Sequence, residues 1–190
     1  VEGIKEFDQQ HLFTAHTHPE CSPVIEYARG DWVDVNCTYT YEIVHRKLLA
    51  DYRRLPVRPF FLMESSYEGE HNASPVQIRR QAYWAILCGG CGQFFGNRPI
   101  WLYDPGWQKA MDATGSQDMV HVRNLFMSRP WYHLVPDDEH KVVTKGLGEY
   151  RGLNYLAAAR TIDGGTIIAY LPTPRTFTVE LSKIRGNTAR

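Results

Sequence analysis

Hydrophobic and polar positions repeat in one pattern over the first 131 residues, where short apolar runs alternate with amphipathic segments. This alternation is typical of parallel βα units. The apolar runs predict four strands, at residues 11–16, 32–37, 58–63 and 92–95. The segments between and after them predict helices at about 23–29, 42–55, 75–88 and 107–126. Four βα units are too few to close a barrel, so the sequence predicts an incomplete α/β barrel.

The pattern changes after Pro136, where only β-strand runs follow. They lie at residues 141–144, 155–161, 166–171 and 177–181. Asp163-Gly-Gly165 separates the second run from the third and predicts a tight turn, so residues 155–171 should form a hairpin. Four short strands rarely complete a sandwich. We therefore predict an α/β unit over residues 1–135 and the start of a β-sandwich domain over residues 136–190.

Charge and composition narrow the classes of ligand. Twenty-one Lys and Arg residues balance twenty-one Asp and Glu residues, which leaves no net positive field to attract nucleic acid or an anionic membrane. Aromatic residues make up 13%, with five Trp and eleven Tyr. Aromatic faces stack well on sugar rings, although they also fill ordinary cores. A neutral or weakly charged ligand fits this charge balance, and the aromatic residues suit a carbohydrate without identifying one.

The first residues, Val1-Glu-Gly-Ile-Lys5, contain neither an initiator Met nor the apolar core of a signal peptide. We therefore expect the chain to begin inside a longer protein, and its own sequence does not indicate a compartment. No apolar run approaches the roughly 20 residues that span a bilayer, so no membrane segment is predicted.

Cysteine usage gives little support to a redox or metal centre. The chain has four cysteines, and Cys88-Gly-Gly-Cys91 has the spacing of a redox or zinc motif. No second CxxC or CxxH follows it. Packing of small residues between a helix and a strand explains this motif better. We expect no metal and no cofactor.

Candidate functional residues follow the predicted strands. In βα folds the groups that bind and react gather at the carboxyl ends of strands, because the loops there are free to vary. The residues at these ends include a carboxylate, hydrogen-bonding groups and aromatic rings, and all are predicted to face one mouth. They are His16, His18, Asn36, Tyr39, Tyr41, Glu64, Tyr67, Glu68, Asn97 and Trp101.

Glu64 is the strongest catalytic candidate. It follows the nearly continuous apolar run Phe60-Phe-Leu-Met63, and a charge in such a place costs free energy unless it has a partner or a use. A structural interpretation pairs it with Arg79 or Arg80. A functional interpretation makes it a nucleophile toward an anomeric carbon, oriented by Tyr67 or Tyr41.

His16-Thr-His18 allows a different hypothesis, since alternating histidines at a barrel mouth begin the zinc site of some amidohydrolases. Further ligands would have to come from later strands. His45 lies inside a predicted helix, His71 lies on a loop, and no predicted strand ends in Asp. Metal-dependent hydrolysis is therefore less favoured than hydrogen bonding of the two histidines to a polyol or to their own loop.

Three motifs in order resemble one family: Phe61-Leu-Met-Glu-Ser-Ser-Tyr-Glu68, Ile78-Arg-Arg-Gln-Ala-Tyr-Trp84 and Leu125-Phe-Met-Ser-Arg-Pro-Trp-Tyr132. They are similar to the apiosidase-like glycoside hydrolases, in which a DUF4038 catalytic barrel precedes a collagen-binding-type β-sandwich domain. The resemblance implies that this chain is the C-terminal half of a (β/α)8 TIM barrel, strands five to eight up to about Val135, followed by a partial all-β sandwich.

The resemblance also implies a mechanism with two carboxylates, a nucleophile after strand seven and an acid/base after strand four. Glu64 matches the nucleophile, and the acid/base would lie upstream of this chain, in the missing N-terminal half of the same barrel. The implied protein is a retaining glycoside hydrolase that removes apiose or another sugar from polysaccharide side chains, exported or on the cell surface. This chain alone should be inactive. A non-catalytic carbohydrate-binding barrel is the alternative, and an upstream carboxylate after strand four would separate the two hypotheses. His16-Thr-His18 and Cys88-Gly-Gly-Cys91 depart from the family pattern, which leaves the choice of substrate open.

Overall fold

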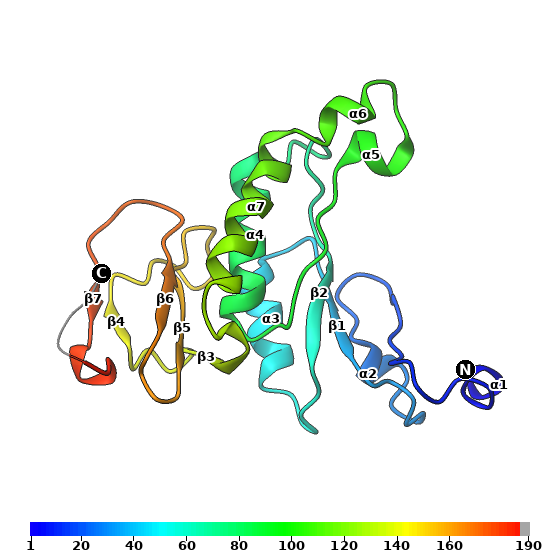
Figure 1. Cartoon of the computed structure of the whole chain (residues 1–190), viewed down its shortest axis with the longest axis horizontal. Coiled ribbons are helices and arrows are strands. Elements are labelled where there is room, and N and C mark those ends of the chain that lie inside the picture. Colours follow the sequence, from blue (N-terminus) through cyan, green and yellow to red (C-terminus); the bar gives the residue numbers. More distant parts are fainter. Residues whose placement is uncertain (187–190) are drawn as a thin grey trace.

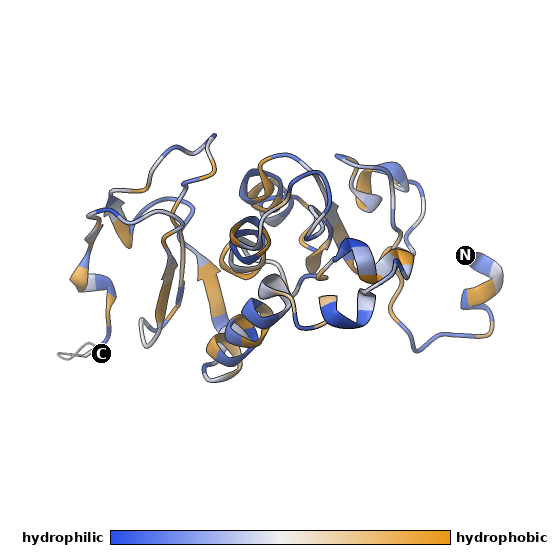
Figure 2. Ribbon diagram, turned by 90° about the horizontal axis from the view of Figure 1, so that it is seen from above, coloured by the Kyte–Doolittle hydropathy of each residue, from blue (hydrophilic) through white to orange (hydrophobic). Residues whose placement is uncertain are grey.

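The computed structural model describes residues 1–186 and arranges them in successive layers (Figure 1). A small parallel sheet forms one layer, and helices α3, α4 and α7 pack beside it. The strands of the C-terminal part lie on the other side of these helices (Figure 1). Figure 2 shows the same order from above, with both polar and apolar positions on the helices between the two β layers. No helix in the described part of the chain is long and apolar enough to cross a membrane.

Two predicted strands form the parallel sheet. Strand β1 (Asn36–Tyr39) pairs with β2 (Phe60–Glu64), with Asn36 opposite Phe60 and Tyr39 opposite Glu64. The segment 92–95, which was predicted as a strand, makes fewer hydrogen bonds to this sheet than a full strand would. Its backbone makes two hydrogen bonds to Leu62, from Leu62 N to Gly92 O (3.1 Å) and from Phe94 N to Leu62 O (3.1 Å). It is therefore a single parallel bridge at Gln93 rather than a strand.

The predicted strand at 11–16 is wrong, because this segment is irregular. A strand needs a series of alternating hydrogen bonds to one partner. Here the carbonyl oxygen of Phe13 accepts hydrogen bonds from two successive amides, Asp34 N (2.9 Å) and Val35 N (3.1 Å). The amide of Phe13 donates to the carboxylate of Asp34 instead of to a backbone carbonyl. The segment lies beside β1 without forming a ladder.

Helices form at the predicted places 23–29, 42–55 and 75–88, and the first two of them are shorter than predicted, whereas the short helix at residues 2–5 was not predicted. Helix α4 begins as its sequence predicts, because Ser74 accepts a hydrogen bond from Gln77 N (3.3 Å) and Pro75 occupies the first turn. Short helices are α1 (Glu2–Lys5) and α2 (Pro23–Glu26), and longer ones are α3 (Val44–Tyr52) and α4 (Pro75–Leu87).

The single helix predicted at 107–126 is also wrong. The chain forms α6 (Trp107–Ala110) and then α7 (Thr114–Met127), with a break between them. Another helix, α5 (Arg98–Leu102), occupies a segment predicted as a loop. The hydrophobic periodicity continues through the break, but the N-terminus of α7 is fixed by a residue far away in sequence, as described below.

The C-terminal part forms two small antiparallel sheets. The hairpin predicted around Asp163 is confirmed, since β5 (Ala157–Thr161) pairs with β6 (Ile167–Tyr170). Strand β3 (Leu134–Pro136), which the sequence did not predict, pairs with β5 across the position where the two domains were separated. The second sheet joins β4 (Val143–Lys145) to β7 (Thr178–Val179). Two short 3-10 helices, Trp131–His133 and Leu181–Lys183, complete the described elements.

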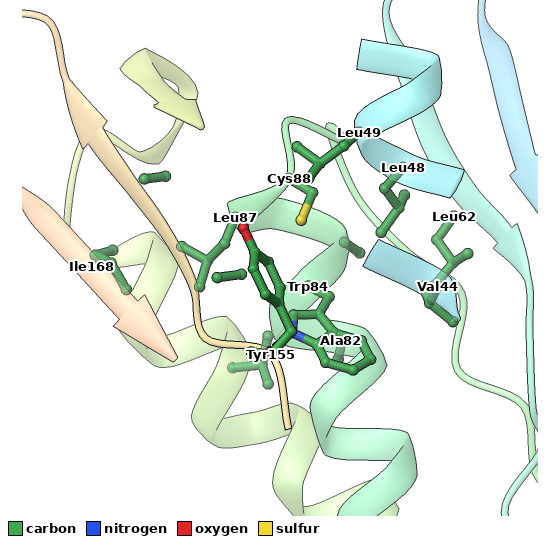
Figure 3. Packing of buried hydrophobic residues seen from close by; sticks show 14 of the residues in the cluster. Val44, Leu48, Leu49, Leu62, Ala82, Trp84, Leu87, Cys88, Tyr155 and Ile168 are labelled. Atoms are coloured by element: carbon green, nitrogen blue, oxygen red, sulfur yellow. Dashed lines mark hydrogen bonds between the residues drawn. The ribbon is translucent and has the colours of Figure 1, made fainter. Parts of the chain in front are cut away.

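One hydrophobic core joins these layers around α4 (Figure 3). Ala82, Trp84 and Leu87 of α4 are almost completely buried. Leu48 packs against them from α3, and Tyr155 from the chain just before β5 (Figure 3). Both β layers therefore depend on burial of the same helix.

His45 of α3 lies where the helices meet the C-terminal part. Its ring stacks on Tyr155 with centroids 4.4 Å apart, and it lies 4.5 Å from the ring of Trp84. Its Nε2 donates to the carbonyl oxygen of Tyr150 (2.7 Å), and its Nδ1 has no partner within residues 1–186. Burial lowers the pKa of His45 to about 4. The imidazole is therefore neutral near neutral pH.

We predict that the protein loses stability as the pH falls from about 6.5 toward 4, because His45 binds a proton more tightly in the unfolded chain than in the folded one. The loss from this residue should reach about 2 kcal/mol by pH 5. His45→Gln keeps a hydrogen-bond donor and does not titrate, so this part of the pH dependence should disappear. Denaturant unfolding at pH 7 and pH 5 measures the difference. Exposed His11 supplies the control His11→Gln, and equal pH dependence in wild type and His45→Gln would contradict the prediction.

Candidate active site

Glu64 lies where β2 ends, beside the end of β1. The pairing of the two strands is irregular between Thr38 and Tyr39, so Tyr39 stands opposite Glu64. The chain stays close beyond the sheet, since Thr40 N donates to Glu64 O (3.1 Å). The side chain of Glu64 is 14% exposed. The strand thus delivers the carboxylate to the edge of the core rather than into the helical layer.

Two side chains from different segments hold this carboxylate. His16 Nε2 lies 2.8 Å from Glu64 Oε2, and the hydroxyl of Tyr41 donates to Glu64 Oε1. One close contact to each oxygen restricts the orientation of the Glu64 carboxylate.

Tyr39 completes this aromatic cluster. Its hydroxyl lies 3.2 Å from that of Tyr41, and its ring lies 4.8 Å from the imidazole of His16. Burial, and then the hydrogen bond to Glu64, raise the pKa of Tyr41 well above its usual range. Tyr41 therefore keeps its proton and remains a donor at physiological pH.

A cavity of about 700 Å³ opens in front of Glu64. Aromatic rings line it on two sides, with Tyr67 and Trp101 in an edge-to-face contact at 6.2 Å. Its lining is Tyr41, Glu64, Ser66, Tyr67, Glu70, His71, Ala73, Gln77 and Trp101. A volume of this size is ordinary for a small-molecule site. The combination of apolar rings, hydroxyls and carboxylates can bind a polyol.

The sequence predicted part of this lining and missed five members, Ser66, Glu70, His71, Ala73 and Gln77. All five follow β2 within thirteen residues of Glu64, in the loop or in the first turn of α4. Gln77 Nε2 donates to Ser66 Oγ (2.7 Å), which ties the helix start to the loop. Their place shortly after the end of a strand could have identified them, but the predicted candidates after this strand ended at Glu68.

The loop after β2 has an unusual backbone. Gly69, His71 and Asn72 have φ angles of 77°, 48° and 61°, in the left-handed region that non-glycine residues seldom adopt. Hydrogen bonds within the loop hold it, including Ala73 N to Glu70 O (2.8 Å). Such conformations persist where surrounding structure determines them, and they concentrate at ligand sites. The loop directs Glu70 and His71 to the cavity.

The side chain of Glu68 makes hydrogen bonds inside the fold and does not line the cavity, although Glu68 is only four residues from Glu64. It is buried, its Oε1 accepts from Gly115 N (2.9 Å), and its Oε2 accepts from Asn97 Nδ2 (3.3 Å). Gly115 is in the first turn of α7, whose own N-cap, Ala113, provides no side-chain acceptor. A Cβ at Gly115 would lie 2.5 Å from Glu68 Oε2, so a larger residue would collide with the carboxylate. Glu68 caps α7 and places its charge at the positive end of the helix.

Asn36 and His18 also lie away from the cavity. Asn36 is the first residue of β1 rather than the last, and its Oδ1 lies 3.1 Å from Ser22 Oγ. Ser22 in turn donates to Asp51 (2.9 Å), so this buried network joins β1 to the helices beside it. The strand was expected to end at Cys37 but continues to Tyr39, which moves Asn36 to the far end of the strand. His18 is exposed, with Nδ1 2.9 Å from the carbonyl oxygen of Pro19.

A family of known proteins matches most of this chain. The sequence model of a family described as "Apiosidase-like, catalytic domain" matches residues 1–133. The chain belongs to this family. The resemblance based on three motifs is thereby confirmed. Among curated proteins none matches the chain.

Solved structures show what fold this apiosidase-like chain has. It resembles a crystal structure described as a glycoside hydrolase family 5 protein from Bacteroides vulgatus ATCC 8482, with a TM-score of 0.82 at 22% identity. A second structure, described as a glycoside hydrolase, gives a TM-score of 0.83 at 23% identity. The matches cover 97% of this chain but 48% and 49% of those chains. The apiosidase-like chain therefore has a mixed α/β fold like part of these structures and spans about half their length.

In this apiosidase-like chain, Glu68 should contribute more to stability than Glu64. Glu68→Gln replaces an acceptor of Gly115 N with a group that only partly substitutes for it, so the free energy of unfolding should fall by about 1–3 kcal/mol. Glu64→Gln changes a residue beside an open cavity, and its effect on stability should stay within about 0.5 kcal/mol. Denaturant unfolding of both variants checks this pair. Equal stability of the two would contradict the assigned roles.

Proposed function

We propose that this chain supplies the C-terminal half of the (β/α)8 barrel of a retaining glycoside hydrolase, with Glu64 as the nucleophile. The observation that carries the proposal is the Glu64 carboxylate at the end of β2, held by His16 and Tyr41 at the edge of a cavity of about 700 Å³. Family membership and the fold of the similar structures support the reaction class.

The coverage of relatives supports the half-barrel interpretation. Strand β1 lies parallel to β2, and β2 lies parallel to the bridge at Gln93, so these segments can be neighbours in the wall of a barrel. Residue 13 on one side and residue 94 on the other would then each adjoin a strand that this chain does not supply. We propose that the other half of the same barrel covers these edges, and that residues 136–190 begin a β-sandwich domain.

In the proposed reaction, one oxygen of Glu64 attacks the anomeric carbon of the sugar as the bond to the leaving oxygen breaks. A second carboxyl group, on a strand outside this chain, gives its proton to the leaving oxygen. The same group then takes a proton from water, which attacks the anomeric carbon and frees Glu64. The sugar is released with its original anomeric configuration. Because both steps need the second carboxyl about 5 Å from the first, we propose that this chain alone is inactive.

His16 and Tyr41 position the nucleophile in this scheme. A carboxylate that accepts one hydrogen bond, from Tyr41, keeps lone pairs free for attack, since it has about four acceptor sites. The Tyr41 hydroxyl also stabilises the charge before the sugar arrives and again as Glu64 leaves the intermediate, and His16 restricts the position of the other oxygen.

The substrate class proposed is a neutral sugar on a polysaccharide side chain, such as apiose or another terminal or branching residue. The cavity lining supports this, because Tyr67 and Trp101 offer apolar faces while Ser66, Glu70 and Gln77 offer hydrogen bonds. Zero net charge fits a neutral ligand. The same cavity lining would also suit a non-catalytic carbohydrate-binding barrel, which is the second candidate function.

Glu64→Gln in the full-length protein should lower kcat by several orders of magnitude while sugar binding persists, because the charge is lost and the shape is kept. Turnover of an apiose-terminated oligosaccharide and calorimetric binding to the same sugar measure the two effects. Azide should restore turnover to Glu64→Ala and yield a glycosyl azide of inverted configuration. Glu70→Gln, which alters another cavity carboxylate, is the matched control and should keep measurable turnover.

Near-native activity of Glu64→Gln would remove Glu64 from the mechanism. Binding of the sugar by a wild-type protein that hydrolyses none would favour the non-catalytic barrel. Inverted anomeric configuration of the product, followed by NMR, would exclude the retaining mechanism.

Trp101→Ala should raise KM about tenfold and leave kcat within about twofold, which corresponds to the loss of roughly 1.4 kcal/mol of stacking on the sugar. Trp101 lines the cavity and is 52% exposed, so its ring is available to a ligand. Leu102→Ala, on the same short helix but outside the cavity lining, is the control. An unchanged KM in Trp101→Ala would place the sugar elsewhere.

A further inference from the structure

A second cluster of reactive side chains lies beside the segment that carries His16. His18, Cys21 and Glu26 each offer one ligand atom, and these three atoms all lie within 4.8 Å of one another. Cys21 Sγ is 3.3 Å from Glu26 Oε2. An imidazole, a thiol and a carboxylate are the side chains that bind zinc in proteins.

The separations suit a cation of this kind. Zinc bonds are about 2.0–2.3 Å long, so atoms bound to one tetrahedral zinc lie about 3.3–3.8 Å apart. The sulfur and the carboxylate oxygen already have this separation, and small rotations of the exposed His18 ring would bring the third atom to it. Within residues 1–186 no cationic side chain forms an ion pair with Glu26, so its charge is available to a metal.

We propose that His18, Cys21 and Glu26 bind one Zn²⁺ ion, with water in the remaining position. On binding, the Cys21 thiol releases its proton to solvent, and the thiolate and carboxylate together balance the charge of the metal. The sequence alone predicted no metal, because it offered no well-placed further ligands for a site at His16 and His18. In the structure His16 contacts Glu64 instead, and the turn at His18 approaches Cys21 and the end of α2.

The metal would restrain a segment that has little regular structure. Residues 8–22 form neither helix nor strand. Few hydrogen bonds hold the turn, among them Glu20 N to Tyr39 O (2.9 Å) and Thr17 Oγ1 to Cys21 O (2.7 Å). A bond through zinc from His18 to Glu26 would join this turn to α2 and restrict the position of His16, two residues earlier. The role is structural, and it holds whether or not Glu64 is a nucleophile.

The test is zinc binding by the full-length protein after treatment with a chelator. Isothermal titration with zinc chloride should give one tight site per chain, and Co²⁺ should give the charge-transfer absorption that a thiolate ligand produces. Cys21→Ser should weaken zinc binding by at least about tenfold and remove that absorption. Cys91→Ser changes an exposed cysteine outside the cluster and should bind zinc as the wild type does.

Thermal unfolding gives a second readout that needs no substrate. Zinc should raise the Tm of the wild type and of Cys91→Ser, and it should not raise the Tm of Cys21→Ser or His18→Ala. The proposal is overturned if the wild type binds no zinc. It is also overturned if Cys21→Ser binds zinc as tightly as the wild type, or if the cobalt complex lacks the thiolate absorption.

Discussion

Burial of α4 on both of its sides is the constraint on which the rest of the structure depends. Trp84 contacts the layer on one side through its ring, and its indole nitrogen donates to the carbonyl oxygen of Tyr155 on the other (3.1 Å). Arg79 reaches Asp118 of α7 at 3.1 Å, which fixes the neighbouring helix. Since α4 starts directly after the loop that follows β2, the position of the helix also fixes that loop. The cavity therefore depends on packing far from the groups that line it.

The hydrophobic pattern predicted elements whose determinants are local. Helix α4 has its cap, its proline and its apolar face within its own sequence, and the hairpin has its turn residues between its two strands. Glu64 could be singled out for the same reason, as a charge directly after an apolar strand. The family resemblance used motifs from these same segments, and the family match agrees with it.

The predictions that were wrong concern elements whose ends are determined by residues distant in the sequence. The segment at 11–16 has strand-like alternation, but its backbone meets Asp34 and Val35 through one carbonyl rather than a ladder. The break before α7 depends on Glu68, forty-seven residues from the amide that it caps. Neighbouring glutamates with similar sequence surroundings can thus have different roles, since the direction of a side chain after a strand end is set by the loop conformation.

The carboxylates of this chain can be separated by how their acceptor sites are used. Asp51 accepts from Ser22, Thr38 and Arg54 in the core, and Glu68 accepts from Gly115 and Asn97. Their partners lie on elements that must stay together, so these charges stabilise the fold. Glu64 differs because the groups that contact its carboxylate are two rings on loops, His16 and Tyr41, and because it also lines the cavity. A fully enclosed carboxylate cannot reach a sugar, whereas an oriented carboxylate with free lone pairs can attack one. This difference in environment, rather than the residue type, is the physical reason for which we propose Glu64 as the nucleophile.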